Sequence, residues 1–174
     1  MEESMATQKN QATPARMELA NRLFFRLYQC ANLLHKTGTR AVEDLGLTTQ
    51  QWAVLGALSR PEVIDGISVG DLAQYLLVSR QNLSGVINRM ERDGHIQCTP
   101  DKLDRRSRLV TMTASGIEVW NNQALPRIYN YYEQALTDLS ISDMTHMLHY
   151  LLKLGDNMKQ LDIEPNDTME EEAI

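Results

Sequence analysis

Cysteine is scarce in this sequence, and neither of its two cysteines lies in a metal-binding or disulfide pattern. Cys30 and Cys98 are not part of a CxxC pair, and neither has a histidine at metal-ligand spacing. Free thiols are typical of proteins in a reducing compartment. We therefore expect two free thiols and no metal site.

Long apolar runs are missing as well. No stretch approaches the ~20 consecutive apolar residues that a membrane helix needs. Residues 1–15 are polar and lack the apolar core of a secretory signal, so they are expected to form a flexible arm. Together with the free thiols, this pattern predicts a cytoplasmic protein without a membrane partner.

The sequence also lacks the motifs that mark common enzymes: it has no nucleophile elbow, no phosphate-cradling glycine loop and no metal motif. His146 and His149 lie three residues apart on one face of a predicted helix and could form half of a metal site, but no third ligand is evident. A surface or interface role is favoured for them. An enzyme is the weaker interpretation, and we predict no catalytic residue and no cofactor.

Negative charge is present in excess, but it is concentrated at one end. The formal net charge is -6, and the six carboxylates of residues 162–174, a stretch without a base, account for all of it. Residues 79–108 instead carry seven basic and four acidic side chains, a local net charge of +3. Such a patch on an acidic protein can bind phosphate. The acidic tail is expected to be flexible, and it either shields this patch or aids solubility.

Helical periodicity dominates the chain. Residues 15–44 repeat leucine near helical spacing, and Gly46 ends that helix. Thr48 or Thr49 caps a second helix that stops before Pro61, and residues 61–66 are predicted to be a loop. A later helix begins at residues 113–116 and should bend near Pro126, which lacks a backbone donor. The last helix is expected to begin at a Ser142 cap.

Two short helices follow one another closely in the middle of the chain. Ser68 and Asp71 form a capping box for the first, and Ser79 caps the second after a tight turn. Gly94 is expected to end the second helix. Its apolar residues recur at helical spacing: Leu83, Val86, Ile87 and Met90. This pattern predicts a helix-turn-helix.

Two β-type segments, 95–100 and 107–112, come directly after this motif and flank a charged loop. A helix-turn-helix followed by a hairpin is a winged helix, in which the second helix enters the major groove of DNA and the hairpin reaches the neighbouring backbone or minor groove. A solvated polar face or a protein-binding module would share this pattern. The fold class we predict is mainly α with a small β-hairpin wing.

Side chains that read bases or contact phosphate occupy the expected outward face and the wing. Arginine can pair with guanine and Gln or Asn with adenine, while polar side chains near a helix N-terminus suit phosphate oxygens. Asp104 is expected to pair with Arg106 and shape the wing, which leaves Arg105 at the tip for the minor groove. The candidate DNA-binding residues are Ser79, Arg80, Gln81, Asn82, Ser84, Asn88, Arg89, Lys102, Arg105, Arg106 and Arg108.

The segments GLTTQQWAVLGAL, ISVGDLAQYLLVSRQNLSGVINRMERDGHI and LDRRSRLVTMTASG resemble the MarR family of bacterial transcription regulators over roughly residues 16–160. The resemblance implies a homodimer whose recognition helices meet successive major grooves of a pseudopalindromic double-stranded DNA operator. It also implies a repressor that a small organic effector, an aromatic acid or its acyl-CoA thioester, releases from DNA. The implied organisation is an arm (1–15), a dimerisation helix (16–47), a winged helix-turn-helix lobe (48–113), dimerisation helices (114–161) and a tail (162–174).

In this family the effector binds between the dimerisation layer and the DNA-binding lobe. The residues that the resemblance suggests for this pocket are Phe24, Tyr28, His35 and Trp52, with Arg22 or Arg26 for a carboxylate. An aromatic stripe at helical spacing is also typical of a protein core. A redox switch at Cys30 is the alternative mode of control, although the peroxide-sensing branch has its cysteine where this chain has Phe24.

Overall fold

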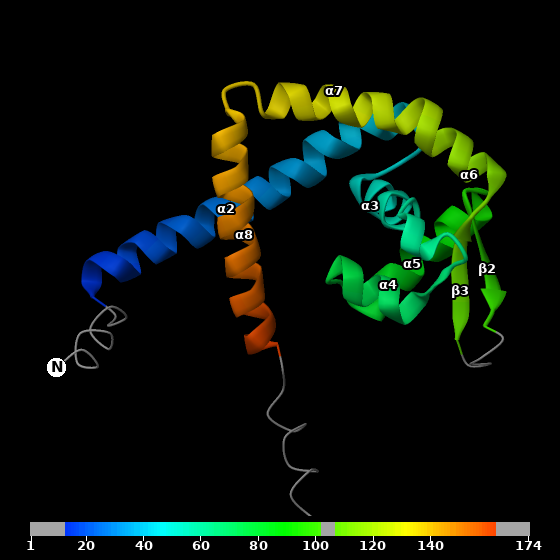
Figure 1. Ribbon diagram of the computed structural model, residues 1–174, viewed down its shortest axis with the longest axis horizontal. Coiled ribbons are helices and arrows are strands. Elements are labelled where there is room, and N and C mark those ends of the chain that lie inside the picture. Colours follow the sequence, from blue (N-terminus) through cyan, green and yellow to red (C-terminus); the bar gives the residue numbers. More distant parts are fainter. Residues whose placement is uncertain (1–12, 102–106, 163–174) are drawn as a thin grey trace, which may run out of the picture. The chain divides into compact units, whose positions relative to one another are not determined.

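The computed structural model describes residues 13–101 and 107–162, and the chain divides into two compact units at Tyr131/Tyr132 (Figure 1). The wing-loop candidates Lys102, Asp104, Arg105 and Arg106 lie outside the described residues. Within the first unit, helix α2 (Pro14–Val42) begins at a Thr13 cap. It gives way to the 3₁₀ turn η2 (Glu43–Leu45), after which Gly46 adopts a left-handed conformation with φ of 70°. The long first helix and its glycine stop are therefore confirmed.

Helix α3 (Thr49–Leu58) resolves the choice between two caps in favour of Thr48. The Thr48 hydroxyl accepts from the Gln51 N–H, and the Gln51 side chain accepts from the Thr48 N–H, which satisfies two donors that a helix start leaves free. The loop predicted over residues 61–66 instead contains a 3₁₀ turn, η3 (Pro61–Val63), because proline at a first helical position costs no hydrogen bond.

The helix-turn-helix forms as predicted, from α4 (Val69–Leu76) and α5 (Arg80–Arg92). Leu77 ends α4 in a left-handed conformation with φ of 53°, and Val78 donates its N–H back to the Ala73 carbonyl. The Ser68 hydroxyl accepts from the Asp71 N–H and donates to the Asp71 carboxylate, so the predicted capping pair is present in a modified form.

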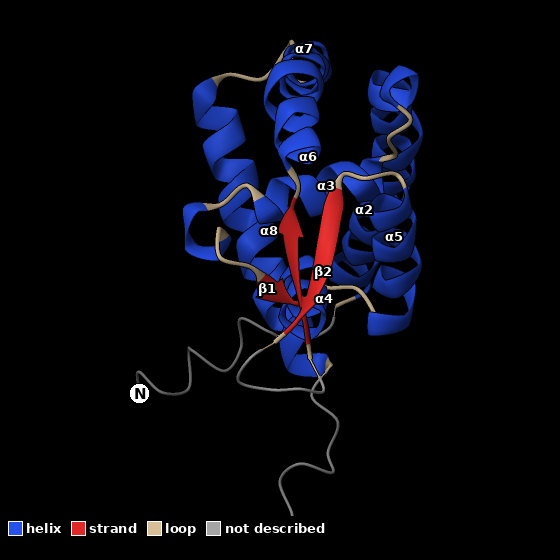
Figure 2. Cartoon of the chain, turned by 90° about the vertical axis from the view of Figure 1, so that its right-hand side faces the viewer, coloured by secondary structure: helices blue, strands red, loops and turns tan. Residues whose placement is uncertain are grey.

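The wing is a hairpin of β2 (Ile96–Pro100) and β3 (Arg108–Met112), paired antiparallel with Cys98 opposite Val110. A third strand, β1 (Ile67–Ser68), pairs with β3, so the sheet order is β1-β3-β2 (Figure 2). The two-stranded prediction was incomplete because two residues are too few to show an alternating pattern.

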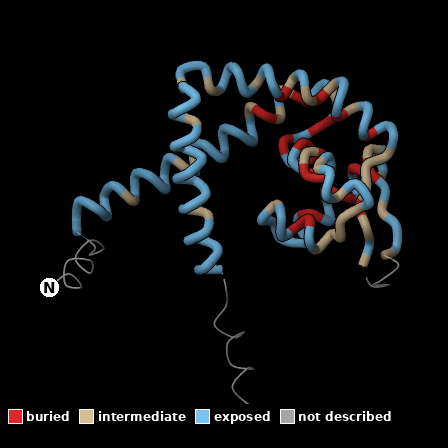
Figure 3. The backbone as a smooth tube through the Cα atoms, in the orientation of Figure 1, coloured by how far each residue is buried: buried red, intermediate tan, exposed pale blue. Residues whose placement is uncertain are grey.

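The core of the first unit lies where α3, α4 and α5 pack against the sheet and the start of the following helix (Figure 3). All four apolar residues predicted for the inner face of α5 are buried there. Its largest fully buried side chains are Leu47, Leu55, Leu72, Met90, Ile96, Ile128, Val42, Val54 and Val110. Most of α2, by contrast, is exposed along its first half (Figure 3).

After the wing, the chain forms α6 (Ala114–Glu118), a π-helical segment η4 (Val119–Ala124) and α7 (Leu125–Ala135). The Leu125 N–H donates to the Trp120 carbonyl, five residues back, so the hydrogen-bond pattern changes immediately before Pro126. The interruption that Pro126 predicted is thus a widened turn of helix.

The second unit contains α8 (Ile141–Leu161). Its cap is Ser140 rather than Ser142, and the prediction was wrong because Ser140 has the better partner: Asp143, three residues on, completes a capping box. Among the described residues no helix, α2 and α8 included, has the length and apolarity to cross a membrane.

Candidate nucleic-acid interface

Helix α5 has one buried apolar face and one exposed polar face. The Ser79 hydroxyl accepts from the Asn82 N–H, as expected of the cap, and Gly94 with φ of 79° ends the helix. There Gly94 and His95 donate to carbonyls of the last turn, which completes a Schellman motif. All the polar residues predicted to face DNA from this helix are exposed: Ser79, Arg80, Gln81, Asn82, Ser84, Asn88 and Arg89.

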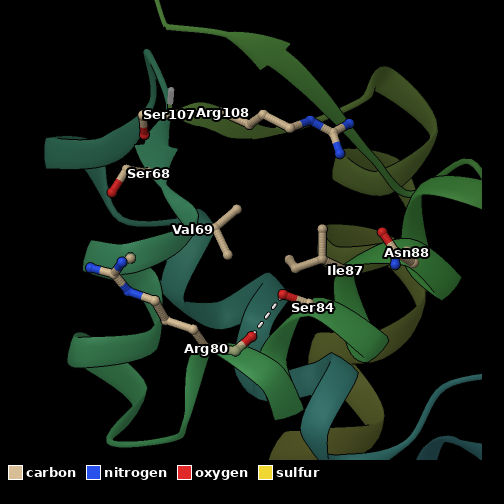
Figure 4. Close-up of a pocket in the computed structure, with 9 residues that line it drawn as sticks. Ser68, Val69, Arg80, Ser84, Ile87, Asn88, Ser107 and Arg108 are labelled. Carbon is tan, nitrogen blue, oxygen red and sulfur yellow. Dashed lines mark hydrogen bonds between the residues drawn. The ribbon is translucent and has the colours of Figure 1, made fainter. Parts of the chain in front are cut away.

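A cleft of about 500 Å³ lies between α5 and the wing (Figure 4). Arg80, Ser84 and Asn88 enter it from one face of α5, and Arg108 borders it from the wing. Two of its lining side chains are guanidinium groups and none is a carboxylate, so the cleft suits an anionic ligand. The sequence did not predict the remaining lining residues, which β1 and the end of the wing loop bring here: Ser68, Val69, Gly70, Ile87 and Ser107.

Several of these side chains are held by local hydrogen bonds. The Ser84 hydroxyl donates to the Arg80 carbonyl at 2.7 Å, which leaves its oxygen lone pairs to accept from a ligand (Figure 4). Arg89 donates through Nε to the Gly85 carbonyl at 3.2 Å. Arg80 lies against Gly70, where an added Cβ would stand 2.9 Å from the guanidinium. The glycine therefore makes room for Arg80.

Arg108 is engaged within the protein. Its guanidinium donates to both carboxylate oxygens of Glu91 at 3.2 Å, while its side chain remains 53% exposed. Glu91 was not singled out in the sequence, because an acid in a basic helix reads as solvation. The structure thus assigns Arg108 a partner other than DNA in the unbound protein.

Asn82 lies on the other flank of α5 from Arg80 and lines a second cavity, of about 310 Å³. This cavity is mostly apolar and is bounded by α2, α3, α4 and α5. His35, a predicted effector-binding residue, lines it from α2. The other lining residues were not predicted, because their convergence depends on how the helices pack: Leu34, Thr49, Gln50, Ala53, Val54, Leu76, Val78, Leu83 and Val86.

The other residues predicted for the effector pocket lie elsewhere. Trp52 is buried in the core, edge-on to Tyr131 with ring centroids 5.9 Å apart. Tyr28 is exposed on α2, as is Phe24, which borders a shallow hollow with Arg22. Arg26 donates to Gln29 at 3.0 Å. The structure therefore does not bring the predicted set together.

The cysteines and histidines form no recognisable reactive or metal centre in the part of the chain that the structure describes. No group of three potential metal ligands occurs within residues 13–101 and 107–162. Burial and the nearby Glu91 carboxylate raise the pKa of the Cys98 thiol, which disfavours the reactive thiolate. Cys30 is exposed on α2.

Comparison with known proteins agrees with this geometry. Residues 45–107 match the sequence profile of the MarR family. The transcriptional activatory protein BadR of Rhodopseudomonas palustris is 72% identical over 151 residues, which cover 87% of this chain and 86% of that protein. The homoprotocatechuate degradative operon repressor of Escherichia coli is 31% identical over 128 residues, which cover 72% and 83%.

Solved structures share the fold. AbsC, a MarR family transcriptional regulator from Streptomyces coelicolor, superposes with a TM-score of 0.71 at 22% identity, covering 87% of this chain and 99% of that one. MepR from S. aureus, solved in complex with DNA, gives 0.68 at 23% identity, covering 77% and 96%. This chain therefore belongs to the MarR family of winged-helix, DNA-binding transcription regulators, whose members are not enzymes.

Proposed function

We propose that the protein binds a pseudopalindromic operator as a homodimer and releases it when a small aromatic acid enters the cavity beside the recognition helix. The observation that carries the proposal is the double use of α5. One flank of this helix supplies the cationic cleft, and the other flank lines an apolar cavity. A ligand in that cavity touches the helix that reads DNA.

The operator-reading residues we propose are on the outward face of α5. Gln81, Ser84 and Asn88 lie farthest from its buried face by helical spacing, and Arg80 flanks them toward the wing. Gly85 lies among them with open space around it, so the helix backbone can approach a duplex closely. Arg89 flanks the same stripe on the opposite side.

The DNA-reading proposal is tested on a duplex that the full-length protein selects from a random-sequence pool. Arg80→Ala and Gln81→Ala should reduce discrimination between this duplex and a scrambled one by about 1–3 kcal/mol each, since each removes a base contact. Arg40→Ala, which removes an exposed charge from α2, is the control and should leave discrimination unchanged. Unaltered discrimination in both α5 variants would contradict the assignment.

Homodimer formation is supported by the exposed apolar side chains of α2 and α8, each of which would stand in water in a single chain. On α2 the exposed set is Met17, Leu19, Leu23, Phe24, Phe25, Tyr28, Leu33 and Leu34. On α8 it is Ile141, Met147, Leu148, Tyr150, Leu151, Leu152, Met158 and Leu161. A second copy that covers these faces also supplies the second recognition helix that a pseudopalindrome requires.

The size and lining of the cavity favour a single-ring acid. A volume of about 310 Å³ is at the small end for ligand pockets, so an acyl-CoA thioester could place only its acyl group inside. Arg22 and Arg26 do not line it, whereas His35, Gln50 and Asn82 offer donors for a carboxylate. The name of the E. coli relative, a homoprotocatechuate degradative operon repressor, supports an aromatic effector.

A thermal-shift screen of phenolic acids, aromatic carboxylates and acyl-CoA thioesters tests the effector proposal, because a ligand of the native state raises the melting temperature. Ala53→Phe should abolish the shift by filling the cavity while operator binding persists. Ala135→Phe, at an exposed position outside the cavity, should keep it. A ligand that shifts wild type and Ala53→Phe equally would place the effector elsewhere.

The direction of control has two candidates. Release of DNA relieves repression where the operator overlaps a promoter, which is the direction that the family resemblance implies. The 72% identical relative is named a transcriptional activatory protein, which favours activation. In vitro transcription from a promoter joined to the selected operator decides between them: added protein lowers transcript for a repressor and raises it for an activator.

A further inference from the structure

The last turn of α5 contacts both strands of the wing through one side chain. Glu91 Oε1 accepts from the backbone N–H of Cys98 in β2 at 3.0 Å, and both of its oxygens accept from Arg108 of β3 at 3.2 Å. We call these three residues the wing clamp. A single carboxylate therefore ties the recognition helix to the base of the hairpin.

The contact with β2 depends on sheet topology. Strand β2 is at the edge of the sheet, because the order is β1-β3-β2. The Cys98 N–H donates to Glu91 rather than to a neighbouring strand. Both carboxylate oxygens are thus used, and the strand edge and the guanidinium are fixed relative to the helix.

A carboxylate at this place needs a reason, because a negative charge beside a DNA-binding cleft repels phosphate. We infer that Glu91 holds the wing at the angle from which it reaches DNA, and that Arg108 is a positioning residue that serves Glu91 rather than a contact to the duplex. The inference rests on the wing contacting DNA, as the family's fold and the function proposed above require. In Figure 4 the guanidinium groups of Arg80 and Arg108 lie on opposite sides of the view, in keeping with separate roles.

The expected effect is modest for each wing and is multiplied in a dimer. Glu91 is 35% and Arg108 53% exposed, so the ion pair alone contributes little stability. Its consequence is conformational: without the clamp, the wing samples other orientations, and the apparent affinity falls with the fraction that is competent to bind. We expect affinity to fall about threefold per wing, and about tenfold for a dimer that uses both.

The sign of one substitution tests the inference. Glu91→Gln removes a negative charge near DNA, which by electrostatics alone should tighten binding; the clamp instead predicts weaker binding to the selected duplex. Asp93→Asn is the matched control, because Asp93 also lies at the end of α5 but pairs with Arg92. This control should bind as tightly as wild type or more tightly. Glu91→Gln binding at least as tightly as its control would refute the clamp.

Arg108→Gln gives a second, independent measurement. If Arg108 bound a phosphate, its removal would flatten the dependence of log affinity on log salt by about one for each phosphate. A positioning residue should lower affinity with the salt slope unchanged. The double variant Glu91→Gln/Arg108→Gln should also bind no more weakly than the worse single variant, because both break the same ion pair. A flattened slope would overturn the role given to Arg108.

The Cys98 thiol reports directly on the clamp. In a Cys30→Ser background, the pH dependence of alkylation measures the pKa of Cys98, which burial and Glu91 raise. Glu91→Gln should move that pKa downward, and Asp93→Asn should not. An unchanged profile would mean that the carboxylate does not lie at Cys98 in solution. Failure of the wild-type protein to select any duplex would instead contradict the proposed function.

Discussion

Replacing Gly116 with alanine should strongly destabilise the junction between the wing and α6. Gly116 is buried, and a Cβ at this position would lie 1.9 Å from the carbonyl oxygen of His95 and 2.9 Å from its carbonyl carbon. Ordinary contact begins at 3.4 Å, so a gap of about 1.5 Å must open. Because both atoms belong to the backbone, no side-chain rotation relieves the overlap.

The cost follows from the hydrogen bonds that the required shift would break. The Thr113 N–H donates to the His95 carbonyl at 3.1 Å, and the Thr113 hydroxyl donates to the Gly94 carbonyl at 2.6 Å and caps α6. Hydrogen bonds contribute about 1 kcal/mol each, and overpacking costs about 1–3 kcal/mol. The better helix propensity of alanine returns about 1 kcal/mol. We therefore expect the free energy of unfolding to fall by about 3 kcal/mol.

Urea unfolding followed by far-UV circular dichroism measures this change. Protein concentration must be held constant, because the midpoint of a dimer depends on it. Gly85→Ala is the control: it lies in α5 with nothing within 4 Å, and it should stabilise the protein by about 0.5–1 kcal/mol. If Gly116→Ala unfolds within about 0.5 kcal/mol of wild type, the close approach to His95 is wrong.

Three further changes test other features. Leu77→Gly should stabilise the protein by about 0.5–1 kcal/mol in urea, because its backbone is left-handed and its side chain 68% exposed, whereas Gly94→Ala at φ of 79° should destabilise it by about 1 kcal/mol. Leu148→Glu on the exposed face of α8 should convert the dimer to monomer in sedimentation. Hydrogen bonds from Ser140 lower the pKa of Asp143, so their stabilisation is present above the ordinary carboxyl pKa and is lost as pH falls through the lowered value. Ser140→Ala should raise that pKa toward its ordinary value in an NMR titration.

Local signals predicted the elements that carry the DNA-binding site. Ser79 and Gly94 bracket α5 because a serine cap and a glycine stop act within a few residues, and the spacing of Leu83, Val86, Ile87 and Met90 marks its buried face. The hairpin was likewise evident from its β-type segments. What these signals share is that each can be read without knowing how distant segments pack.

Contacts between elements distant in sequence escaped prediction. β1 could not be recognised before its pairing with β3, and Glu91 gains a role only through Cys98 and Arg108 on two later strands. The cavity failed for the same reason: periodicity indicated an aromatic stripe on α2, but packing directs His35 to the cavity and Trp52 to the core. The sequence identifies the faces of helices, and tertiary packing decides what each face meets.

The two flanks of α5 explain why a small ligand could control DNA binding in this architecture. Leu83 and Val86 are buried core residues and also line the cavity, so a ligand that fills it must displace α5 as a body or leave it in place. A displaced α5 moves Arg80 and, through Glu91, the wing. Base contacts and backbone contacts then weaken together, and only ~1.4 kcal/mol of coupling is needed for a tenfold loss of affinity. Because the wing clamp joins the two kinds of contact, disrupting it should make the wing less responsive to the effector than the recognition helix.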